Sequence, residues 1–327
     1  MNTIAVGSRH SARDRLLSIL RHQGALVALI LASIFGFARY AAFLTPENLL
    51  NIVRQNSMVG LVALGMTFVI LGGGIDLSVG AVLAVAGVAT VYFANFGTLA
   101  AVIAGVGSAA LIGLINGLLI SKARIQPFIT TLAMMIAARG LALAVTHENS
   151  IPLSADARGL EWLGRGEVAG LPVPVLILLV VLALSWAVLH YTPFGRHVYA
   201  VGDNPDAARL LGLRVDRVLI TTYVLSGAFA GLAGAILASR LGAAQPVAGT
   251  GWELDAIAAV VVGGTVLTGG QGGVGLTMIG VLLLGVILNL LNLEGTISPW
   301  WQWVIRGAFL LAVVVVQGRM QRGTARD

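Results

Sequence analysis

Long apolar runs separated by short polar segments make up almost the whole of this chain. A helix needs about 20 mostly apolar residues to cross a hydrocarbon core of about 30 Å. Measured against that length, the pattern predicts an all-α polytopic membrane protein. We expect about ten transmembrane helices, at residues 25–43, 58–71, 78–93, 98–120, 128–145, 173–190, 218–239, 254–267, 274–291 and 301–316.

Glycine clusters lie at two of the shorter runs. Residues 72–74 are all glycine and follow the run 58–71, and glycines 263–264 lie near the end of the run 254–267. Loose backbone is tolerated inside a membrane only where protein or a water-filled cavity surrounds it. We therefore expect these two helices to be broken or re-entrant.

The two glycine-containing segments also align with each other. Residues 73–80 and 263–270 match at a spacing of 190 residues, with glycine at three positions, one shared leucine and a Ser/Thr pair. Internal duplication of this kind is typical of transporters, whose binding and gating elements are commonly discontinuous helices between repeats. The pattern thus predicts a transporter with an internal repeat.

Composition agrees with a membrane location. Hydrophobic residues make up 57% of the 327 residues and charged residues only 10%, whereas soluble domains carry about 25% charged residues. The chain has no cysteine, which excludes disulfides, thiolate catalysis and cysteine-held metal centres. The net charge of +6 is spread between apolar runs and forms no basic stripe, so nucleic acid is not a predicted partner.

The basic residues indicate how the chain is oriented. With a cytoplasmic N-terminus and ten alternating spans, the cytoplasmic side receives 13 of the 20 Lys and Arg residues, as the positive-inside rule requires. They are Arg9, Arg13, Arg15, Arg21, Lys122, Arg124, Arg196, Arg209, Arg214, Arg217, Arg319, Arg322 and Arg326. We therefore predict one transmembrane domain over residues 1–327 with both termini cytoplasmic. Within this domain we expect four segments outside the membrane: an N-terminal cytoplasmic segment (1–24), an outer loop (146–171), an inner loop (191–217) and a cytoplasmic tail (317–327).

The inner loop contains a sequence typical of a short capped helix. Asn204 is a favourable N-cap, Pro205 suits the first helical position, and Gly212 suits the end of the helix. A short amphipathic helix on this surface needs a partner to dock against. An ordinary solvated connector is the alternative interpretation.

Charged residues inside spans are functional candidates, because they are costly unless they are paired or hydrated. Asp76 either caps backbone N–H groups at the start of a span or lines a polar route, and Asp255 leaves the same two alternatives. Arg139 and Arg306 are expected to bind carboxylates or carbonyl groups and so to hold helices together, and a role as substrate ligands is the alternative.

Uncharged polar side chains in and beside the spans form a second group of candidates. They either donate hydrogen bonds to a neutral polyol or hold neighbouring helices together. With Asp76 and Asp255, the candidates for a translocation pathway are Ser78, Asn116, Gln126, Thr265, Thr268 and Gln271.

No motif in the chain predicts an enzyme. The single lysine, Lys122, does not follow the phosphate-binding pattern G-x-x-x-x-G-K-[ST]. We therefore expect no ATPase site and no bound cofactor. The five histidines lack the i, i+4 spacing of a metal site, and no G-x-S-x-G hydrolase motif is present.

Several motifs together resemble the permease subunits of bacterial ribose-type sugar ABC importers, and the resemblance covers nearly the whole chain. The motifs are residues 65–80 (GMTFVILGGGIDLSVG), 126–132 (QPFITTL), 200–204 (AVGDN) and 253–265 (ELDAIAAVVVGGT). Within that family, residues 150–152, 194–195, 197–200, 295–296, 298 and 300–301 are most similar to the YjfF-type permease of the galactofuranose importer.

The resemblance implies a type II-like importer permease in a bacterial inner membrane. It implies a homodimer or heterodimer with a second permease, cytoplasmic subunits that bind and use ATP, and a periplasmic sugar-binding protein. The expected contacts with the ATPase are Asp203, Asn204, Arg209, Leu211, Gly212 and Arg214. The outer loop becomes periplasmic, and the expected contacts with the binding protein are Glu148, Asp156, Glu161 and Trp162.

The resemblance therefore predicts import of a monosaccharide, galactofuranose or a related sugar, through a passage between subunits. Selectivity would rest with the binding protein, so no deep, high-affinity sugar pocket is expected in this chain alone. Two alternatives stay open. One is a branched-chain amino-acid permease of the same superfamily, and the other is a secondary transporter or facilitator that works without an ATPase.

Overall fold

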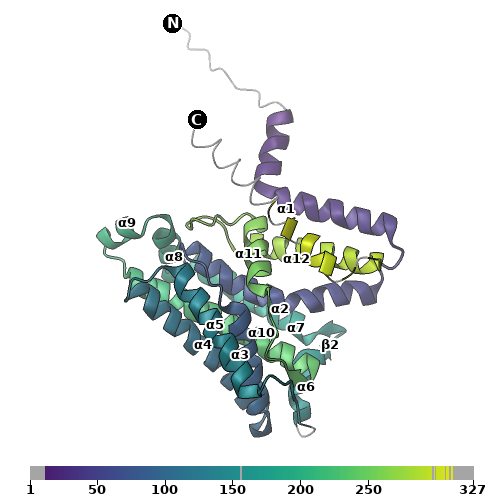
Figure 1. Ribbon diagram of the computed structural model, residues 1–327. Coiled ribbons are helices and arrows are strands. Elements are labelled where there is room, and N and C mark those ends of the chain that lie inside the picture. The colour runs from purple at the N-terminus through teal and green to yellow at the C-terminus, as the bar shows by residue number, and fades with distance from the viewer. Residues whose placement is uncertain are drawn as a thin grey trace.

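A computed structural model describes residues 12–154, 157–296, 298, 300–305, 307–308 and 311 of the chain. Figure 1 shows a helical bundle with α9 and α6 at opposite ends. We call these the α9 end and the α6 end. The elements are α1 (Ala12–Arg39), α2 (Pro46–Leu71), α3 (Val79–Tyr92), η1 (Ala94–Phe96), α4 (Thr98–Ser121), α5 (Pro127–Thr146), β1 (Ile151–Pro152), α6 (Arg158–Arg165), β2 (Glu167–Val168), β3 (Leu171–Pro172), α7 (Val173–Tyr191), α8 (Pro193–Asp203), α9 (Pro205–Leu210), α10 (Val215–Leu241), β4 (Ala243–Ala244), α11 (Trp252–Gly263) and α12 (Val274–Glu294).

Nine of the ten predicted apolar runs coincide with helices, and half of the tenth, 301–316, lies outside the described residues. Six described helices are long and apolar enough to cross a membrane: α2, α4, α5, α7, α10 and α12. The apolar part of α1, Gly24–Arg39, and α3 are shorter. A multi-pass helical protein is thus confirmed, whereas the predicted count of about ten spans is not.

One predicted run is too short. The run 58–71 is only the second half of α2, a 26-residue helix. The helix begins at Pro46, where the side chain of Thr45 accepts a hydrogen bond from the backbone N–H of Asn48. The polar residues 54–56 interrupt the apolar run but not the helix, because backbone hydrogen bonding continues through them. The helix then ends at Leu71, before the glycines, as expected.

The connecting segments contain more structure than the sequence suggested. The expected all-α fold carries two small antiparallel sheets, β1 with β4 and β2 with β3, and the first of them brings part of the outer loop against the α10–α11 connection. The inner loop 191–217 contains the 11-residue helix α8 as well as the predicted short helix α9. The helix α6 packs against the end of α10, where the hydroxyl of Ser239 donates to the carbonyl of Leu160.

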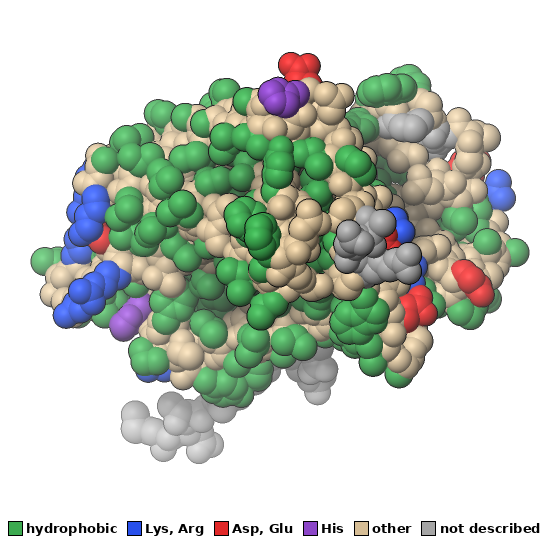
Figure 2. Space-filling model, turned by 90° about the horizontal axis from the view of Figure 1, so that it is seen from below, with side chains coloured by type: hydrophobic (Ala, Val, Ile, Leu, Met, Phe, Trp, Pro, Cys, Tyr) green, Lys and Arg blue, Asp and Glu red, His purple; other side chains and the backbone are tan. Residues whose placement is uncertain are grey.

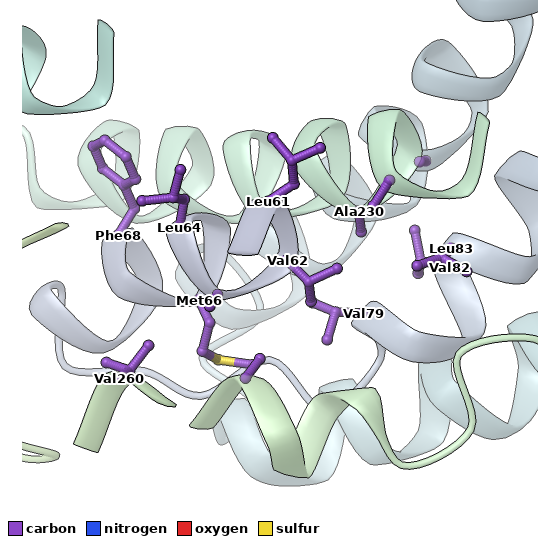
Figure 3. Packing of buried hydrophobic residues seen from close by; sticks show 14 of the residues in the cluster. Leu61, Val62, Leu64, Met66, Phe68, Val79, Val82, Leu83, Ala230 and Val260 are labelled. Atoms are coloured by element: carbon purple, nitrogen blue, oxygen red, sulfur yellow. The ribbon is translucent and has the colours of Figure 1, made fainter. Parts of the chain in front are cut away.

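The core is centred on α2 and α3, which are rich in apolar residues and largely buried. Figure 3 shows side chains of α2, α3, α10 and α11 meeting there, among them Leu61, Phe68, Val82, Ala230 and Val260. Glycines let α4 approach α10 closely, since a Cβ at Gly113 or Gly117 would overlap α10 backbone. Small residues at helix contacts are the usual means of close packing in membranes.

The outer surface of the bundle is apolar. In Figure 2 hydrophobic side chains cover most of the face shown, and charged side chains lie mostly at its margins. Large exposed apolar residues lie on α1, α4, α5 and α7, for example Phe37, Leu99, Ile136 and Leu184. Extensive exposed apolar surface of this kind suits lipid contact, because soluble monomers rarely expose large apolar patches.

Candidate functional site

The helix α9 is built as its sequence predicts. The side chain of Asn204 accepts hydrogen bonds from the backbone N–H groups of Asp206 and Ala207, at 3.1 and 2.9 Å. Pro205 occupies the first turn. Gly212 has φ +79° and is the left-handed residue of a Schellman motif, in which the N–H of Leu213 bonds to the carbonyl of Ala208 at 3.0 Å. The capped-helix prediction is therefore confirmed.

The tip of α9 presents apolar and charged side chains to the outside. Leu210 and Leu211 are 90% and 80% exposed, and Arg209 pairs with Asp206 at 2.9 Å. All six residues predicted to contact an ATPase, Asp203, Asn204, Arg209, Leu211, Gly212 and Arg214, are exposed here. Two adjacent exposed leucines on a rigidly capped helix are available for contact with another protein.

The end of α8 is packed against both glycine breaks of the internal repeat. A Cβ at Gly202 would overlap the carbonyl oxygen of Leu71, the last residue of α2. One at Gly269 would lie too close to the backbone of Gly202 and Gly73. One at Gly270 would lie too close to Asp203. We call Gly73, Gly202, Gly269 and Gly270 the glycine junction, because their backbones meet without intervening side chains.

Hydrogen bonds hold the glycine junction together. The N–H of Gly270 donates to the carbonyl of Leu71 at 3.0 Å, which connects the second break to the end of α2. The phenol of Tyr199 on α8 donates to the carbonyl of Gly272 at 3.0 Å. A phenol is protonated at neutral pH and can donate, and burial raises the pKa of Tyr199 further. The helix α8, which leads directly into α9, is thus bonded to the loop between α11 and α12.

Basic side chains gather at the α9 end, beside α8 and the start of α10. A cavity of about 350 Å³ lies between α8 and the start of α10, and His197, Arg214 and Arg217 line it together with Phe194 and Leu213. On the neighbouring connection between α4 and α5, Lys122 and Arg124 pair with Asp216 of α10 at 2.8 and 3.4 Å. Much of the positive charge of this end therefore lies close to α9.

The first break, between α2 and α3, is held by a buried polar network. Asp76 is 1% exposed and accepts three hydrogen bonds: from the N–H of Ser78 at 3.0 Å, from its hydroxyl at 2.6 Å, and from the hydroxyl of Ser226 at 2.9 Å. The amide of Asn116 donates to Ser78 at 2.9 Å. The phenol of Tyr223 donates to the carbonyl of Ile75 at 3.3 Å.

This network bears on the two interpretations left open by the sequence. Asp76, Ser78 and Asn116 are each at most 1% exposed, and their hydrogen bonds join the break to α4 and α10 within one chain. That geometry supports a role in holding helices together, in which Asp76 caps the N–H of Ser78. A role for these three residues in the pathway of solute remains an untested prediction.

The other pathway candidates lie in different places. Thr265 is buried and its hydroxyl accepts the N–H of Gly273 at 3.3 Å within the second break. Thr268 and Gln271 are exposed on the same loop, and Gln126 is exposed at the start of α5. Asp255 lies in the first turn of α11 and lines a cavity towards the α6 end. The eight candidates therefore do not form one site.

Arg139 behaves as the sequence predicts. Its guanidinium donates to the carbonyl groups of Pro246 and Ala248, at 2.6 and 2.8 Å, and so ties α5 to the connection before α11. The hypothesis that this arginine binds carbonyl groups and holds helices together is confirmed. Arg306, for which the same role was expected, lies outside the described residues.

The loop at the α6 end holds three of the four residues predicted to contact a binding protein. Glu148 is exposed just after α5, and Glu161 and Trp162 lie on α6, with Trp162 55% exposed. Asp156 lies outside the described residues. The loop is fixed to the bundle by an ion pair between Arg54 and Glu167 at 2.5 Å, and Arg165 donates to the carbonyl of Arg240 at 2.7 Å.

The sequence did not predict which residues from other parts of the chain contact the two breaks. Ser226 and Tyr223 lie inside an apolar run, so nothing in the local pattern distinguishes them from ordinary polar residues of a helix. Gly202 is one of 42 glycines. Its signals in the sequence are its place in the motif 200–204 and its position two residues before a helix cap, and neither predicts contact with both breaks.

Comparison with known proteins identifies the family. Residues 48–314 match the model of the family described as branched-chain amino acid transport system / permease component. The ribose import permease protein RbsC of Bacillus subtilis is 46% identical over 295 residues, which cover 90% of each chain. The ribose import permease protein RbsC of Escherichia coli K12 is 42% identical over 308 residues, covering 92% of this chain and 95% of the relative. The chain therefore belongs to this family of membrane permease components.

The narrower resemblance is corrected by the same comparison. The inner membrane ABC transporter permease protein YjfF of Escherichia coli K12 is 36% identical over 305 residues, covering 88% of each chain. The two ribose import permeases are more similar to the chain than YjfF is, because the short motifs that suggested YjfF are a small part of the sequence. No solved structure matches the chain.

If the Asp76 network holds the fold, its loss will appear first as loss of stability. Replacing Asp76 with Ala leaves three buried donors without an acceptor, each costing about 1–3 kcal/mol, and Ser226→Ala removes one hydrogen bond to a carboxylate, costing about 1.5–3 kcal/mol. We expect Asp76→Ala to lower the thermal unfolding midpoint of the solubilised chain more than Ser226→Ala does.

Ser108→Ala is the matched control, because the hydroxyl of Ser108 bonds to the carbonyl of Gly105 in its own helix. It should leave the unfolding midpoint almost unchanged. If Asp76→Ala unfolds like the wild type but the full transporter that contains it no longer takes up solute, Asp76 would instead be assigned to the pathway.

Proposed function

We propose that this chain is a permease subunit of an ATP-binding-cassette importer that carries a monosaccharide across the inner membrane of a bacterium. Two observations support the proposal. The two RbsC relatives are import permeases named for ribose, and their similarity extends over nine tenths of the chain. The single structural observation that carries the proposal is α9, a capped helix with exposed leucines that follows directly on the helix packed against both breaks of the repeat.

We place the α9 end in the cytoplasm. The basic residues Lys122, Arg124, Arg209, Arg214 and Arg217 gather at this end, which is the distribution that the positive-inside rule requires. The α6 end, with Glu148 and Trp162, then faces the periplasm. Both termini are proposed to lie in the cytoplasm.

A separate ATPase is proposed to dock on α9. The leucines at its tip supply apolar contact, and the cavity lined by His197, Arg214 and Arg217 offers a place for an acidic side chain of that partner. The permease itself contributes no nucleotide site. A second permease subunit, identical or different, would complete the passage, and a periplasmic binding protein would deliver the sugar to the α6 end.

The proposed mechanism transmits motion from the ATPase through backbone contacts. When the ATPase subunits close on ATP, they displace α9, and α8 moves with it because Asn204 joins the two helices. The glycine junction has no side chains that rotate to absorb the displacement. The end of α2 and the loop between α11 and α12 are therefore displaced together, and packed elements of this kind shift between discrete arrangements.

The sugar is proposed to be a ribose-like monosaccharide. The greater similarity to the two ribose permeases supports this choice over galactofuranose, which stays a second candidate because of the motifs shared with YjfF. The family description names branched-chain amino acids, but the two RbsC proteins are named for ribose. The facilitator alternative is likewise not favoured, because RbsC and YjfF are named as import or ABC-transporter permeases.

Reconstitution tests the proposal directly. The chain is placed in vesicles alone, and separately with its second permease, ATPase and binding protein, and uptake of labelled ribose, galactofuranose and leucine is measured. We expect no flux from the chain alone and ATP-dependent ribose uptake by the full assembly. Flux through the chain alone would indicate a facilitator, and uptake of leucine in preference to either sugar would indicate an amino-acid permease.

If motion passes through the glycine junction, one methyl group added there will lower the amount of sugar imported for each ATP hydrolysed. Gly202→Ala places a Cβ on the carbonyl of Leu71 and forces α8 away from the breaks. We expect about tenfold less sugar imported for each ATP hydrolysed, since packed interfaces amplify small shifts. Uptake and hydrolysis are measured on the same vesicles.

Gly275→Ala is the matched control for this experiment. Gly275 lies in the first turn of α12, just after the same loop, and a Cβ there meets no atom within 4 Å. It should leave the ratio of uptake to hydrolysis unchanged. If Gly202→Ala also leaves the ratio unchanged in an assembled complex, the glycine junction does not transmit the motion.

A further inference from the structure

A polar cavity that is open to the surface lies between helices towards the α6 end, away from α9. Its volume is about 340 Å³, within the range of about 300–1,000 Å³ typical of small-molecule sites. Four helices, α2, α10, α11 and α12, supply its walls, and Gln302 lies at its edge. This space is separate from the glycine junction and from the Asp76 network.

The lining of this cavity is unusually polar for the interior of a membrane bundle. It combines amides with opposite charges and one indole ring, from Asn56, Asn292, Gln302, Asp255, Arg240 and Trp252. Polar groups inside a bundle are costly to bury and commonly mark substrate pathways. Arg240 and Asp255 carry opposite charges, so the formal charges of the lining residues cancel.

The packing shows how the amide of Asn56 is accommodated. Its side chain lies against Gly285 of α12, where a Cβ would overlap the amide atoms. The Nδ2 group donates to the carbonyl of Ile52 at 2.7 Å, within α2. Glycine at position 285 therefore leaves room for a polar side chain between α2 and α12 at the wall of the cavity.

The side-chain amides of this region form hydrogen bonds with one another. Gln302 donates to the Oδ1 atom of Asn292 at 3.1 Å, and Asn289 exchanges two hydrogen bonds with Asn48, at 3.1 and 2.7 Å. A carboxamide offers both donors and an acceptor, which is what a hydroxyl group requires. A neutral molecule with several hydroxyls and one apolar face matches amides on several walls and an indole ring.

A smaller, apolar cavity adjoins this one. Its volume is about 40 Å³, and Ala258, Val281 and Ile305 line it. The two cavities share the lining residues Asn56, Val59, Asp255 and Leu288. The apolar cavity is too small for a sugar, so the polar cavity is the one that a sugar can occupy.

We propose that this cavity binds one monosaccharide, with hydroxyl groups on Asn56, Asp255 and Asn292 and an apolar sugar face on Trp252. The inference rests on the proposed function and assigns the first site that a sugar occupies after release from its binding protein. A cavity with few fixed hydrogen bonds binds weakly, and weak binding suits a site that must pass its ligand on.

Saturation-transfer NMR of ribose with the solubilised full-length chain tests this assignment, because the method detects weak binding. We expect a ribose signal with the wild-type chain and a decrease of about fivefold in Asn56→Leu and Trp252→Leu, consistent with the loss of a hydrogen bond or a contact surface. Asn51→Leu, an exposed position of the same helix that does not line the cavity, is the matched control and should keep the full signal.

Folding of each variant is checked by its thermal unfolding midpoint. Should Asn56→Leu fail to fold, Asn292→Leu replaces it, because Asn292 is exposed at the cavity edge and its loss leaves the packing intact. An undiminished ribose signal in the folded variants, no signal with the wild type, or a stronger signal from leucine than from ribose would each overturn the inference.

Failure of this site is distinguishable from failure of the proposed function. If the full assembly imports ribose while the chain gives no ribose signal, the site is wrong and the function stands. If the full assembly imports no monosaccharide, the proposed function fails whatever the NMR experiment shows.

Discussion

The close approach of three backbone segments at the glycine junction constrains the rest of this structure. The end of α2, the end of α8 and the loop between α11 and α12 meet where Gly73, Gly202, Gly269 and Gly270 lie, and no side chain separates them. Three of these glycines have positive φ, which other residues adopt only with strain. Because both breaks of the internal repeat converge on one helix, a displacement of α8 reaches both. The proposed coupling of α9 to an ATPase depends on this arrangement.

A second constraint comes from the membrane, where loose backbone needs partners within the protein. At the first break, Asp76 accepts from Ser78 and Ser226, and Tyr223 donates to the carbonyl of Ile75. At the second break, the hydroxyl of Thr265 and the carbonyl of Leu71 accept the N–H groups of Gly273 and Gly270. Both glycine sequences therefore lie where a helix ends, α2 at Leu71 and α11 at Gly263, but the two breaks are held by different partners.

Features that depend on neighbouring residues could be predicted from the sequence. The apolar runs predict the helices, Asn204, Pro205 and Gly212 predict the capped helix α9, and the cost of a buried charge predicts the carbonyl partners of Arg139. Features that depend on tertiary contact could not be predicted. The sequence contains no signal that Ser226 would meet Asp76 across 150 positions, or that polar residues of four helices would surround a cavity. The expectation of no deep sugar pocket follows from the weak binding that transport requires, and weak binding is compatible with an open polar cavity.

Pulsed spin-label distances test the central claim that α9 and the breaks move as one unit. The chain has no cysteine, so labels attach only at introduced cysteines. Leu210→Cys, Thr268→Cys and Phe96→Cys, combined two at a time, place pairs of labels on α9, on the second break and near the α6 end. Distances are measured in the assembly with cysteine-free partners, with and without ATP. The account predicts that the distance between positions 210 and 268 stays constant while the distances from both to position 96 change. A change between 210 and 268 with 268 fixed relative to 96 would contradict it.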